Sequence, residues 1–433
     1  MMMNYKETVD YLYRQLPMFS LAGNSAYKKD LHNTIALCES LGNPYKNFKT
    51  IHIAGTNGKG STSHMLAAVL QESGYKTALY TSPHITDFRE RIRVNGVMIE
   101  EQFITEFVEK TKQLSETIQP SFFELTVAMA FDYFSSQDVD IAIIETGMGG
   151  LLDSTNVITP ILSVITNIGY DHQQILGNSL GEIAVQKAGI IKDNVPVIIG
   201  ETLRETQSVF IDAANQKNSK LITVKEQYLI EYIEPAGTLL LCNIKDVQTN
   251  IVEKLRLGLA GMYQAKNAAT VLAAVTELKR QGLDITETAL HSGLEKVREL
   301  TGLRGRWEIL QNHPHIIADV AHNRDGIEQV LQQLQTVYPM AALHFIIGFV
   351  KDKDISEMLK LFPDNATYYF THAHIPRALT SRDLQEKAIA EGLQGLPYEN
   401  INDAIAAAKK AAGEDDVIMI CGSFFIIAEI DNL

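Results

Sequence analysis

The feature that most constrains the fold is a repeated pattern, in which a short β-branched run ending in Gly or Ser precedes a segment with helical apolar spacing. Between residues 49 and 200 the runs are KTIHIAG, KTALYTS, VDIAIIETG, ILSVITNIG and VPVIIG. Apolar strands that alternate with helices are typical of a parallel sheet covered by helices on both faces. The sequence therefore predicts an α/β fold. Residues 221–259 lack a helical period, and we expect them to form an antiparallel excursion at the edge of this sheet.

The length of the chain and its later segments predict two domains. At 433 residues the chain exceeds the roughly 250–300 residues beyond which one hydrophobic core stops growing. Helical patterns end near residue 300, where the glycine-punctuated LTGLRGRW is the expected linker, and strand–helix alternation restarts at HIIADVAHN. We therefore expect a larger domain over residues 1–298 and a smaller, Rossmann-like α/β domain over residues 299–433.

Charge and cysteine content narrow the choice of partners and compartment. An excess of 52 acidic over 38 basic residues, with a net charge of −14, argues against a nucleic acid or an anionic membrane as the main partner. Cys38, Cys242 and Cys421 lack the spacing of a zinc site, and their odd number argues against a disulfide framework. The N-terminus lacks an export signal, and the longest apolar run, residues 417–428, is too short to span a membrane. We expect a cytoplasmic protein with buried, reduced thiols.

A glycine-rich loop, AGTNGKGST, joins a predicted strand over residues 50–54 to a predicted helix over residues 60–73. Backbone N–H groups converge on an anion at such a junction, because the N-terminal end of a helix carries a partial positive charge. Lys59 can reach the outer phosphates of a nucleotide, and Ser61 or Thr62 can offer a hydroxyl to a magnesium ion.

The loop departs from the strict phosphate-loop pattern G-x-x-x-x-G-K-[ST]. Only two residues separate Gly55 from Gly58, and a glycine follows Lys59. A bare glycine turn is therefore the alternative. The coincidence of a lysine, hydroxyls and a strand–loop–helix context favours binding of the β- and γ-phosphates of a nucleotide.

Three polar side chains, those of Ser82, Glu145 and His172, follow the ends of other predicted strands. Ligands of open α/β sheets bind outside the carboxyl ends of the strands, and these three groups are candidate ligands of a magnesium ion on phosphate oxygens. Taken singly, they also fit a Ser-Pro turn, a helix-capping Glu and a hydrogen-bonded His. Lys187, in EIAVQKAGIIK, has helical spacing and on that spacing alone is a solvated or ion-paired side chain.

Nine segments, taken in their order along the chain, resemble the folylpolyglutamate synthase and dihydrofolate synthase family, a branch of the ATP-dependent amide ligases that includes the Mur ligases. They are HIAGTNGKGS, TSPHITDFRERIRVNG, FFELTVAMAF, ETGMGGLLDSTN, TNIGYDH, QKAGIIK, LRGRWE, DVAHN and CGSFFIIAE. The resemblance implies a phosphate-loop N-terminal domain and a ligase that uses ATP and Mg²⁺. Its reaction joins a carboxylate of dihydropteroate, or of the glutamate tail of a reduced folate, to the amino group of L-glutamate. An acyl phosphate is the implied intermediate, and ADP and phosphate are released.

The resemblance also implies roles for individual residues. The implied nucleotide contacts are Gly55, Thr56, Asn57, Gly58, Lys59, Gly60, Ser61, Asn267, Arg306, Asp319 and His322. The implied magnesium ligands are Ser82 and Glu145 for one ion, His172 for a second, and Lys187, which matches a lysine that is carbamylated in the family. The implied folate contacts are Phe122, Phe123 and Asp153, with ordinary core packing as the alternative for both phenylalanines. Lys59, Lys187 and His172 are the expected catalytic residues. Because three nucleotide contacts come from the second domain, closure over ATP is expected.

The sequence departs from the family pattern at a few positions. Leu151 stands where the family has Arg, Gln186 stands where Glu is usual, and Val320 replaces a glycine in DVAHN. The missing arginine leaves one positive contact to folate or between domains unaccounted for. In residues 83–96, alternating arginines either order on substrate binding or form solvent-facing pairs with Asp87 and Glu90.

Three other functions remain open on the sequence. A Mur ligase of cell-wall precursor synthesis is disfavoured, because only 54 residues precede Gly55 where those enzymes place a separate domain of roughly a hundred residues. A nucleotide-dependent switch has no use for the lysine that matches the carbamylated position. A monofunctional folylpolyglutamate synthase is the alternative to the bifunctional enzyme that we favour. The expected partners are small molecules only, and the family tendency is monomeric.

Overall fold

The computed structural model describes residues 3–17, 30–351 and 353–431. The chain folds as two compact units. Unit 1 comprises residues 1–233, 241–258 and 264–303, and unit 2 comprises residues 234–240, 259–263 and 304–433. The passage from unit 1 to unit 2 after Leu303 falls within LTGLRGRW, beyond the expected boundary at residue 298. Unit 2 also takes two short stretches of chain that precede this boundary.

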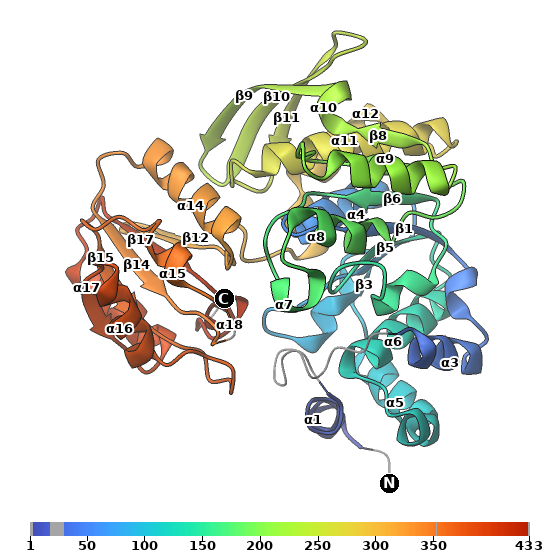
Figure 1. Ribbon diagram of the computed structural model, residues 1–433, viewed down its shortest axis with the longest axis horizontal. Helices are drawn as coiled ribbons and strands as arrows, with labels where there is room; N and C mark the ends of the chain where they lie inside the picture. The colour runs from blue at the N-terminus through green and yellow to red at the C-terminus, as the bar shows by residue number, and fades with distance from the viewer. Residues whose placement is uncertain (1–2, 18–29, 352, 432–433) are drawn as a thin grey trace. The chain divides into compact units, whose positions relative to one another are not determined.

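An eight-stranded sheet forms the centre of unit 1 (Figure 1). Its strands, in spatial order, are β4 (Val97–Met98), β3 (Ile92–Val94), β2 (Thr77–Tyr80), β5 (Ile141–Glu145), β1 (Lys49–Ala54), β6 (Leu162–Ile165), β7 (Val197–Ile199) and β8 (Leu221–Thr223). The run from β2 to β8 is parallel throughout, and β3 and β4 add an antiparallel edge. Each β-branched run of the sequence therefore forms a strand of the predicted parallel sheet.

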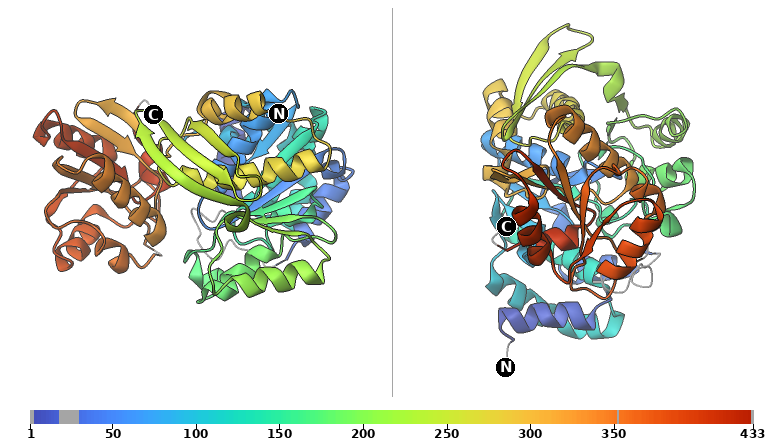
Figure 2. Two further views of the ribbon diagram at one scale, coloured as in Figure 1. Left: turned by 90° about the horizontal axis from the view of Figure 1, so that it is seen from above. Right: turned by 90° about the vertical axis from the view of Figure 1, so that its left-hand side faces the viewer.

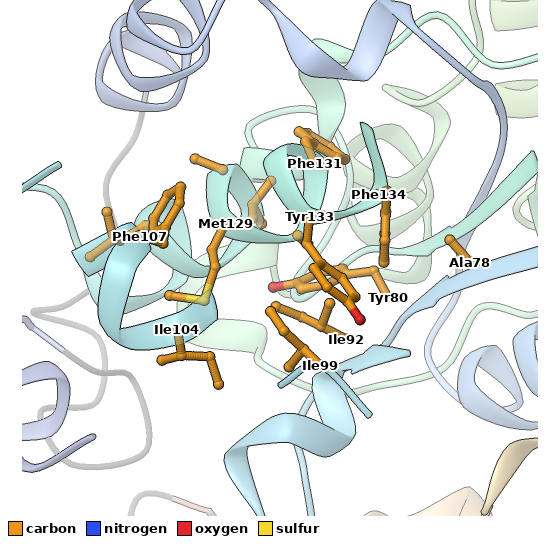
Figure 3. Packing of buried hydrophobic residues seen from close by; sticks show 14 of the residues in the cluster. Ala78, Tyr80, Ile92, Ile99, Ile104, Phe107, Met129, Phe131, Tyr133 and Phe134 are labelled. Atoms are coloured by element: carbon orange, nitrogen blue, oxygen red, sulfur yellow. The ribbon is translucent and has the colours of Figure 1, made fainter. Parts of the chain in front are cut away.

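Helices cover both faces of this sheet (Figure 1). Those of unit 1 are α1 (Tyr5–Gln15), α3 (His32–Ser40), α4 (Lys59–Glu72), α5 (Glu101–Ile118), α6 (Phe122–Ser136), α7 (Gln173–Leu176), α8 (Leu180–Ala188), α9 (Gln207–Gln216), α10 (Val224–Gln227), α11 (Gln264–Arg280), α12 (Glu287–Glu295) and α13 (Val297–Thr301). Helix α4 packs against α11, α12 and strands β1, β2 and β5. Tyr80 and Ile144 instead join α5 and α6 in a separate core cluster, because successive side chains of a strand point to opposite faces. Figure 3 shows Tyr80 in this cluster beside Tyr133 and Phe134.

The expectation for residues 221–259 is wrong in two respects. Leu221–Thr223 forms β8, which pairs in parallel with β7, so the parallel sheet runs one strand further than predicted. The remaining strands β9 (Tyr228–Ala236), β10 (Leu239–Asp246) and β11 (Val252–Leu257) form a three-stranded sheet of their own, in the order β11-β10-β9. The short run Leu221–Thr223 follows a helix, as the other parallel strands do. Its place after a helix therefore indicates a parallel strand, although the residues after it lack a helical period.

Unit 2 is built on a six-stranded sheet, drawn in orange to red in Figure 2. Its strands, in spatial order, are β12 (Glu308–Asn312), β13 (His315–Ala318), β17 (Val417–Cys421), β14 (Leu343–Ile347), β15 (Thr367–Phe370) and β16 (Gly395–Pro397). Only β12 is antiparallel to its neighbour. Its helices are α14 (Arg324–Val337), α15 (Ser356–Leu359), α16 (Ser381–Ala390), α17 (Ile401–Ala411) and α18 (Phe424–Ala428). This is the α/β architecture predicted for the second half of the chain.

The thiols and helix lengths agree with the sequence analysis. Cys38, Cys242 and Cys421 are buried and unpaired, as predicted. Within the described parts of the chain, no helix combines the length and the apolar character needed to cross a bilayer.

A buried carboxylate, Glu277 of α11, ties this helix to the residue before β8. Glu277 is 2 % exposed and accepts hydrogen bonds from Lys220 (3.0 Å), Arg280 (2.6 Å) and Gln281 (3.3 Å). Burial alone raises the pKa of Glu277, but these donors outweigh it and lower the pKa to about 2. Because the folded-state pKa lies below the ordinary value of 4.5, the ionised carboxylate stabilises the fold above that value and loses this effect as pH falls.

We expect Glu277→Gln to lower the free energy of unfolding near neutral pH by about 1–2 kcal/mol, since its partners are half-exposed. Urea unfolding at a series of pH values measures the effect. The difference from the wild-type protein should shrink between about pH 4.5 and about pH 2, where the wild-type carboxyl takes up its proton. A difference that is equal at neutral and acid pH would contradict this role of the charge.

Candidate active site

The glycine loop lies between β1 and α4, as predicted, and the loop after β6 holds its backbone. Asn57 donates its N–H to the Asn167 side chain (2.7 Å), and Thr166 donates its hydroxyl to the Asn57 carbonyl (2.6 Å). Gly55 has a φ of +151° and Gly58 a φ of +82°. A side chain at Gly55 would collide with the Thr166 hydroxyl, and one at Gly58 would collide with the Asn267 side chain. Both glycines are therefore required by close approach as well as by backbone conformation.

Two lysine side chains meet at one carbonyl oxygen of this loop. Lys59 Nζ donates to the carbonyls of Gly55 (3.0 Å) and Thr56 (3.1 Å), and Lys187 Nζ of α8 donates to the same Gly55 carbonyl (2.7 Å). Lys187 is 3 % exposed, so it is not the solvated side chain that its spacing alone suggested. Burial, followed by the nearby charge of Lys59, holds the pKa of Lys187 well below its ordinary value. The structure thus brings the two predicted catalytic lysines together.

Helix α11 reaches the start of α4 through two amide side chains. Gln264 donates to the Ser61 hydroxyl (3.1 Å) and accepts a hydrogen bond from Asn267 (2.8 Å). The Asn267 side chain lies close to Gly58 of the glycine loop. The sequence analysis missed Gln264, although its position three residues before Asn267 on one helix face placed it within reach.

Ser82 and Glu145, predicted to share a magnesium ion, lie together at the carboxyl ends of the adjacent strands β2 and β5. The buried Glu145 carboxylate accepts the Ser82 backbone N–H at 3.3 Å. Oxygen donors of this kind suit Mg²⁺, which commonly takes one or two carboxylates and completes its shell with water and substrate phosphates. Among the described residues no three His, Cys, Asp or Glu side chains form a metal cluster. The donors therefore fit a magnesium ion that arrives with a nucleotide rather than a cage made by protein alone.

His172 lies on the loop after β6 and has a left-handed backbone, with a φ of +49°. Its ring lies 3.9 Å from the carboxylate of Asp171, whose charge also acts on Lys187. The same loop is bound to the glycine loop, because the Thr56 hydroxyl exchanges hydrogen bonds of 3.0 Å with the backbone of Gly169. His172 thus adjoins Asp171, whose charge acts on Lys187, and Glu145 lies on β5, the strand that pairs with β1 ahead of the glycine loop.

The three candidate folate contacts differ in exposure. Phe122 is 2 % exposed and belongs to the core, where its ring contacts Tyr13 and Phe88. Phe123 is partly exposed and lies against Gly147, where any side chain would collide with its ring. The core alternative therefore describes Phe122, and only Phe123 offers a ring face for stacking.

Asp153 is buried and fully engaged by its own loop. Its carboxylate accepts the N–H groups of Met148 (2.8 Å) and Thr155 (3.0 Å) and the Thr155 hydroxyl (2.5 Å). Burial raises the pKa of Asp153, and these hydrogen bonds oppose the rise. This carboxylate shapes the loop after β5 that leads from Glu145.

The arginines of residues 83–96 follow neither single expectation. Arg89 pairs with Asp87 at 2.7 Å, as the surface-pair alternative predicts. Arg91 is 5 % exposed, donates to His84 (2.7 Å) and lies over the Phe122 ring, and Arg93 is 9 % exposed and donates to the Gly96 carbonyl (3.0 Å). For Arg91 and Arg93 the solvent-facing prediction is wrong, because Arg91 packs on the Phe122 ring and Arg93 lies within the buried strand β3.

Two of the departures from the family pattern lie side by side. The Leu151 N–H donates to the Gln186 carbonyl at 2.7 Å, and a side chain at Gly189 would collide with Leu151. Leu151 itself is 42 % exposed. Leu151 and Gln186 thus replace an arginine and a glutamate of the family pattern with two uncharged residues that lie next to each other.

Unit 2 contains three predicted nucleotide contacts: Arg306, Asp319 and His322. Arg306 and His322 lie against one aromatic ring, and Asp319 supplies a buried carboxylate. The guanidinium of Arg306 and the ring of His322 each lie 5.3 Å from the centre of the Phe424 ring. Asp319 is 3 % exposed and accepts hydrogen bonds from the Tyr263 hydroxyl (2.5 Å) and from the backbone N–H groups of Trp307 and Ala321 (both 2.8 Å). Tyr263, Trp307 and Phe424 were not predicted, although Trp307 and Phe424 lie in the quoted segments LRGRWE and CGSFFIIAE and Tyr263 lies four residues before Asn267.

Comparison with known proteins agrees with this geometry. The Mur ligase middle domain matches residues 53–275, and the Mur ligase, glutamate ligase domain matches residues 305–424. A dihydrofolate synthase/folylpolyglutamate synthase of Bacillus subtilis is 35 % identical over 406 residues, covering 91 % of this chain and 92 % of that protein. A folylpolyglutamate synthase of Lacticaseibacillus casei is 31 % identical over 437 residues, covering 99 % and 98 %. The structure of E. coli FolC in complex with DHPP and ADP has a TM-score of 0.86 at 28 % identity, covering 98 % of this chain and 96 % of that one.

The fold and the phosphate loop thus define a Mur ligase, a class that couples ATP to formation of an amide bond. Within this class the chain belongs to the folylpolyglutamate synthase/dihydrofolate synthase family and is an ATP-dependent folate–glutamate ligase. The resemblance read from the nine segments is confirmed, and so is the predicted α/β fold.

Proposed function

We propose that this enzyme is bifunctional and adds L-glutamate both to dihydropteroate and to the glutamate tail of reduced folates. The relative from Bacillus subtilis carries both activities in its name, and it is more similar to this chain than the folylpolyglutamate synthase of Lacticaseibacillus casei. The observation that carries the chemistry is the convergence of Lys59 and the buried Lys187 on the glycine loop.

The glycine loop and Lys59 hold the β- and γ-phosphates of ATP. An oxygen of the substrate carboxylate attacks the γ-phosphorus, the bond to the ADP oxygen breaks, and an acyl phosphate forms. The amine of glutamate then attacks the acyl carbon, phosphate leaves, and the nitrogen loses a proton. No protein nucleophile is required, because binding and charge neutralisation supply the rate. Arg306 and His322 of unit 2 and Asn267 of unit 1 are the further nucleotide contacts in this proposal.

Ser82 and Glu145 would hold one magnesium ion and His172 a second, with Lys187 as a further ligand once carbamylated. When bound, such an ion neutralises phosphate charge and stabilises the departing oxygens. For Lys187 we propose carbamylation: the uncharged amine adds to carbon dioxide, an N–C bond forms, and one proton is released. The low pKa of Lys187 supports this step, since only the unprotonated amine reacts.

Phe123 is the proposed stacking surface for the pteridine ring, since it is the exposed member of the pair. The ligand named in the E. coli FolC complex, DHPP, supports a pteroate-type substrate. Asp153 acts in this proposal by shaping the loop after Glu145.

Parallel assays test the bifunctional assignment. The purified protein is incubated with ATP, Mg²⁺ and glutamate, together with either dihydropteroate or tetrahydrofolate, and glutamylated products are identified by mass. We expect product and phosphate release with both acceptors, and no sustained phosphate release when glutamate or the acceptor is omitted. Product from tetrahydrofolate alone would establish the monofunctional alternative, and activity on neither acceptor would refute the proposal.

A further inference from the structure

One carboxylate of unit 2 fixes the backbone beside two proposed nucleotide contacts. Asp319 Oδ2 accepts the N–H of Trp307, the residue after Arg306. Asp319 Oδ1 accepts the N–H of Ala321, the residue before His322. The Tyr263 hydroxyl donates to Oδ2 at 2.5 Å and fixes the orientation of the carboxylate. A buried carboxylate with three donors from the protein is suited to holding structure.

The backbone held by Asp319 is strained. Trp307 has a φ of +45°, in the left-handed region that a bulky side chain rarely adopts. Neighbouring bonds reinforce the turn, since the Gly305 N–H donates to Glu308 (2.7 Å) and the Gly305 carbonyl accepts the Val320 N–H (3.0 Å). Such conformations persist only where the surroundings over-determine them, and they cluster at functional sites. The turn is therefore fixed in one conformation, and this conformation sets the direction of the Arg306 side chain.

The ring of Phe424 contacts the side chains of both proposed nucleotide contacts. Arg306 stacks its guanidinium on this ring, and the His322 ring lies against it at the same centre distance of 5.3 Å. The Ser423 hydroxyl caps the start of α18 by accepting the Phe425 N–H at 3.1 Å, which fixes the helix that carries the ring. The Phe424 ring thus contacts and orients both the Arg306 and the His322 side chains.

We propose that Tyr263, Asp319 and Phe424 are positioning residues that hold Arg306 and His322 in the orientation needed at the nucleotide. The inference rests on the roles proposed above for Arg306 and His322. It gives Asp319 a supporting role besides the expected nucleotide contact, and it gives functions to Tyr263 and Phe424.

The pH dependence of activity reports the charge state of Asp319. A residue that served only for packing would not change this pH dependence. Burial raises the pKa of Asp319, whereas the Tyr263 hydroxyl, the Arg306 charge and the two backbone N–H groups lower it. The other titratable group that faces it is the buried thiol of Cys421 on β17. Removing the Tyr263 hydroxyl takes away a donor to the ionised form, so the pKa of Asp319 rises further. Protonation then loosens the turn at a higher pH than in the wild-type enzyme.

The test uses the full-length enzyme with saturating folate acceptor and glutamate. We expect Tyr263→Phe to lower kcat about 10-fold or more and to shift the acid limb of its pH profile to higher pH. Phe424→Leu should lower kcat/KM for ATP to a similar extent, whereas Phe424→Tyr, which keeps the ring, should retain most activity. Phe425→Leu, one residue further along the same helix, is the matched control and should behave as wild type.

Arg306→Ala and His322→Ala separate this inference from the proposed function. If both remain active, the nucleotide-contact roles themselves are wrong. If both are impaired while Tyr263→Phe and Phe424→Leu keep the wild-type kcat and pH profile, the positioning role is overturned. Thermal unfolding of each variant shows whether a loss reflects misfolding. A Phe424→Tyr variant that folds but is as inactive as Phe424→Leu also contradicts the role of the ring.

Discussion

Replacing Lys187 with alanine is expected to abolish ligation, lowering kcat by at least about 1000-fold, a loss of roughly 4 kcal/mol of transition-state stabilisation. Lys187 is buried, donates to the Gly55 carbonyl at 2.7 Å and shares that carbonyl with Lys59. The variant loses the group that, once carbamylated, would place a carboxylate next to the phosphates. Steady-state release of phosphate in the presence of acceptor and glutamate measures the effect.

Chemical rescue distinguishes a carbamylated lysine from a simple amine. Acetate or formate should partly restore turnover of Lys187→Ala, because a small carboxylate can enter the space left by the side chain. An alkylamine should not restore it. Rescue by the amine alone would mean that Lys187 acts as a cation, and near wild-type rates without any addition would assign it a structural role. The wild-type enzyme should also lose activity when carbon dioxide and bicarbonate are removed and regain it when they return.

Gly55→Ala is expected to produce the second large loss, about 100-fold or more in kcat/KM for ATP. The φ of Gly55 disfavours any side chain, and the new methyl group would collide with the Thr166 hydroxyl, which binds the Asn57 carbonyl at 2.6 Å. The loop must move, and its N–H groups then no longer converge on the phosphates. Nucleotide binding by calorimetry and steady-state kinetics both measure this loss.

Gly74→Ala is the matched control for this prediction. Gly74 follows the far end of α4, has a φ of +86°, and has open space where a side chain would lie. This variant carries the same kind of backbone strain, so it should lose stability by about 1 kcal/mol while retaining its affinity for ATP. Equal losses of nucleotide affinity in both variants would show that the effect of Gly55→Ala is a general loss of stability.

The parallel sheet was predictable because its signal is local. Each central strand is a short, mostly apolar run that a helix follows, and burial on both faces leaves only a few polar residues, such as His52 and Ser163, within the pattern. The hairpin of β3 and β4 was missed because its strands are very short and β3 carries Arg93, which the fold buries. The strand β8 was misassigned because three residues are too few to establish a period, and pairing with β7 decides its place.

The site divides in the same way. Lys59 and the glycines were predictable because the loop supplies both the ligand-binding groups and their spacing in one stretch of sequence. The position of Lys187 depends on a contact between residues 132 positions apart, and its helical spacing indicates a surface residue. Tyr263, Trp307 and Phe424 leave no local signal, since their roles arise from pairings among distant segments of unit 2. Only the resemblance to a family pointed to Arg306, Asp319 and His322.

The discontinuity of unit 2 has a practical consequence for protein engineering. Residues 259–263 are part of its interior: Ala260 is 1 % exposed in the core cluster of this unit, and Gln333 donates to its carbonyl at 2.9 Å. Gln333 also accepts the Met262 N–H at 2.6 Å. A fragment that begins at residue 304 would lack Ala260 and Met262, and it would leave the buried amide of Gln333 without these hydrogen-bond partners. Chimaeras between relatives should therefore exchange this pentapeptide together with the C-terminal half, as one cassette.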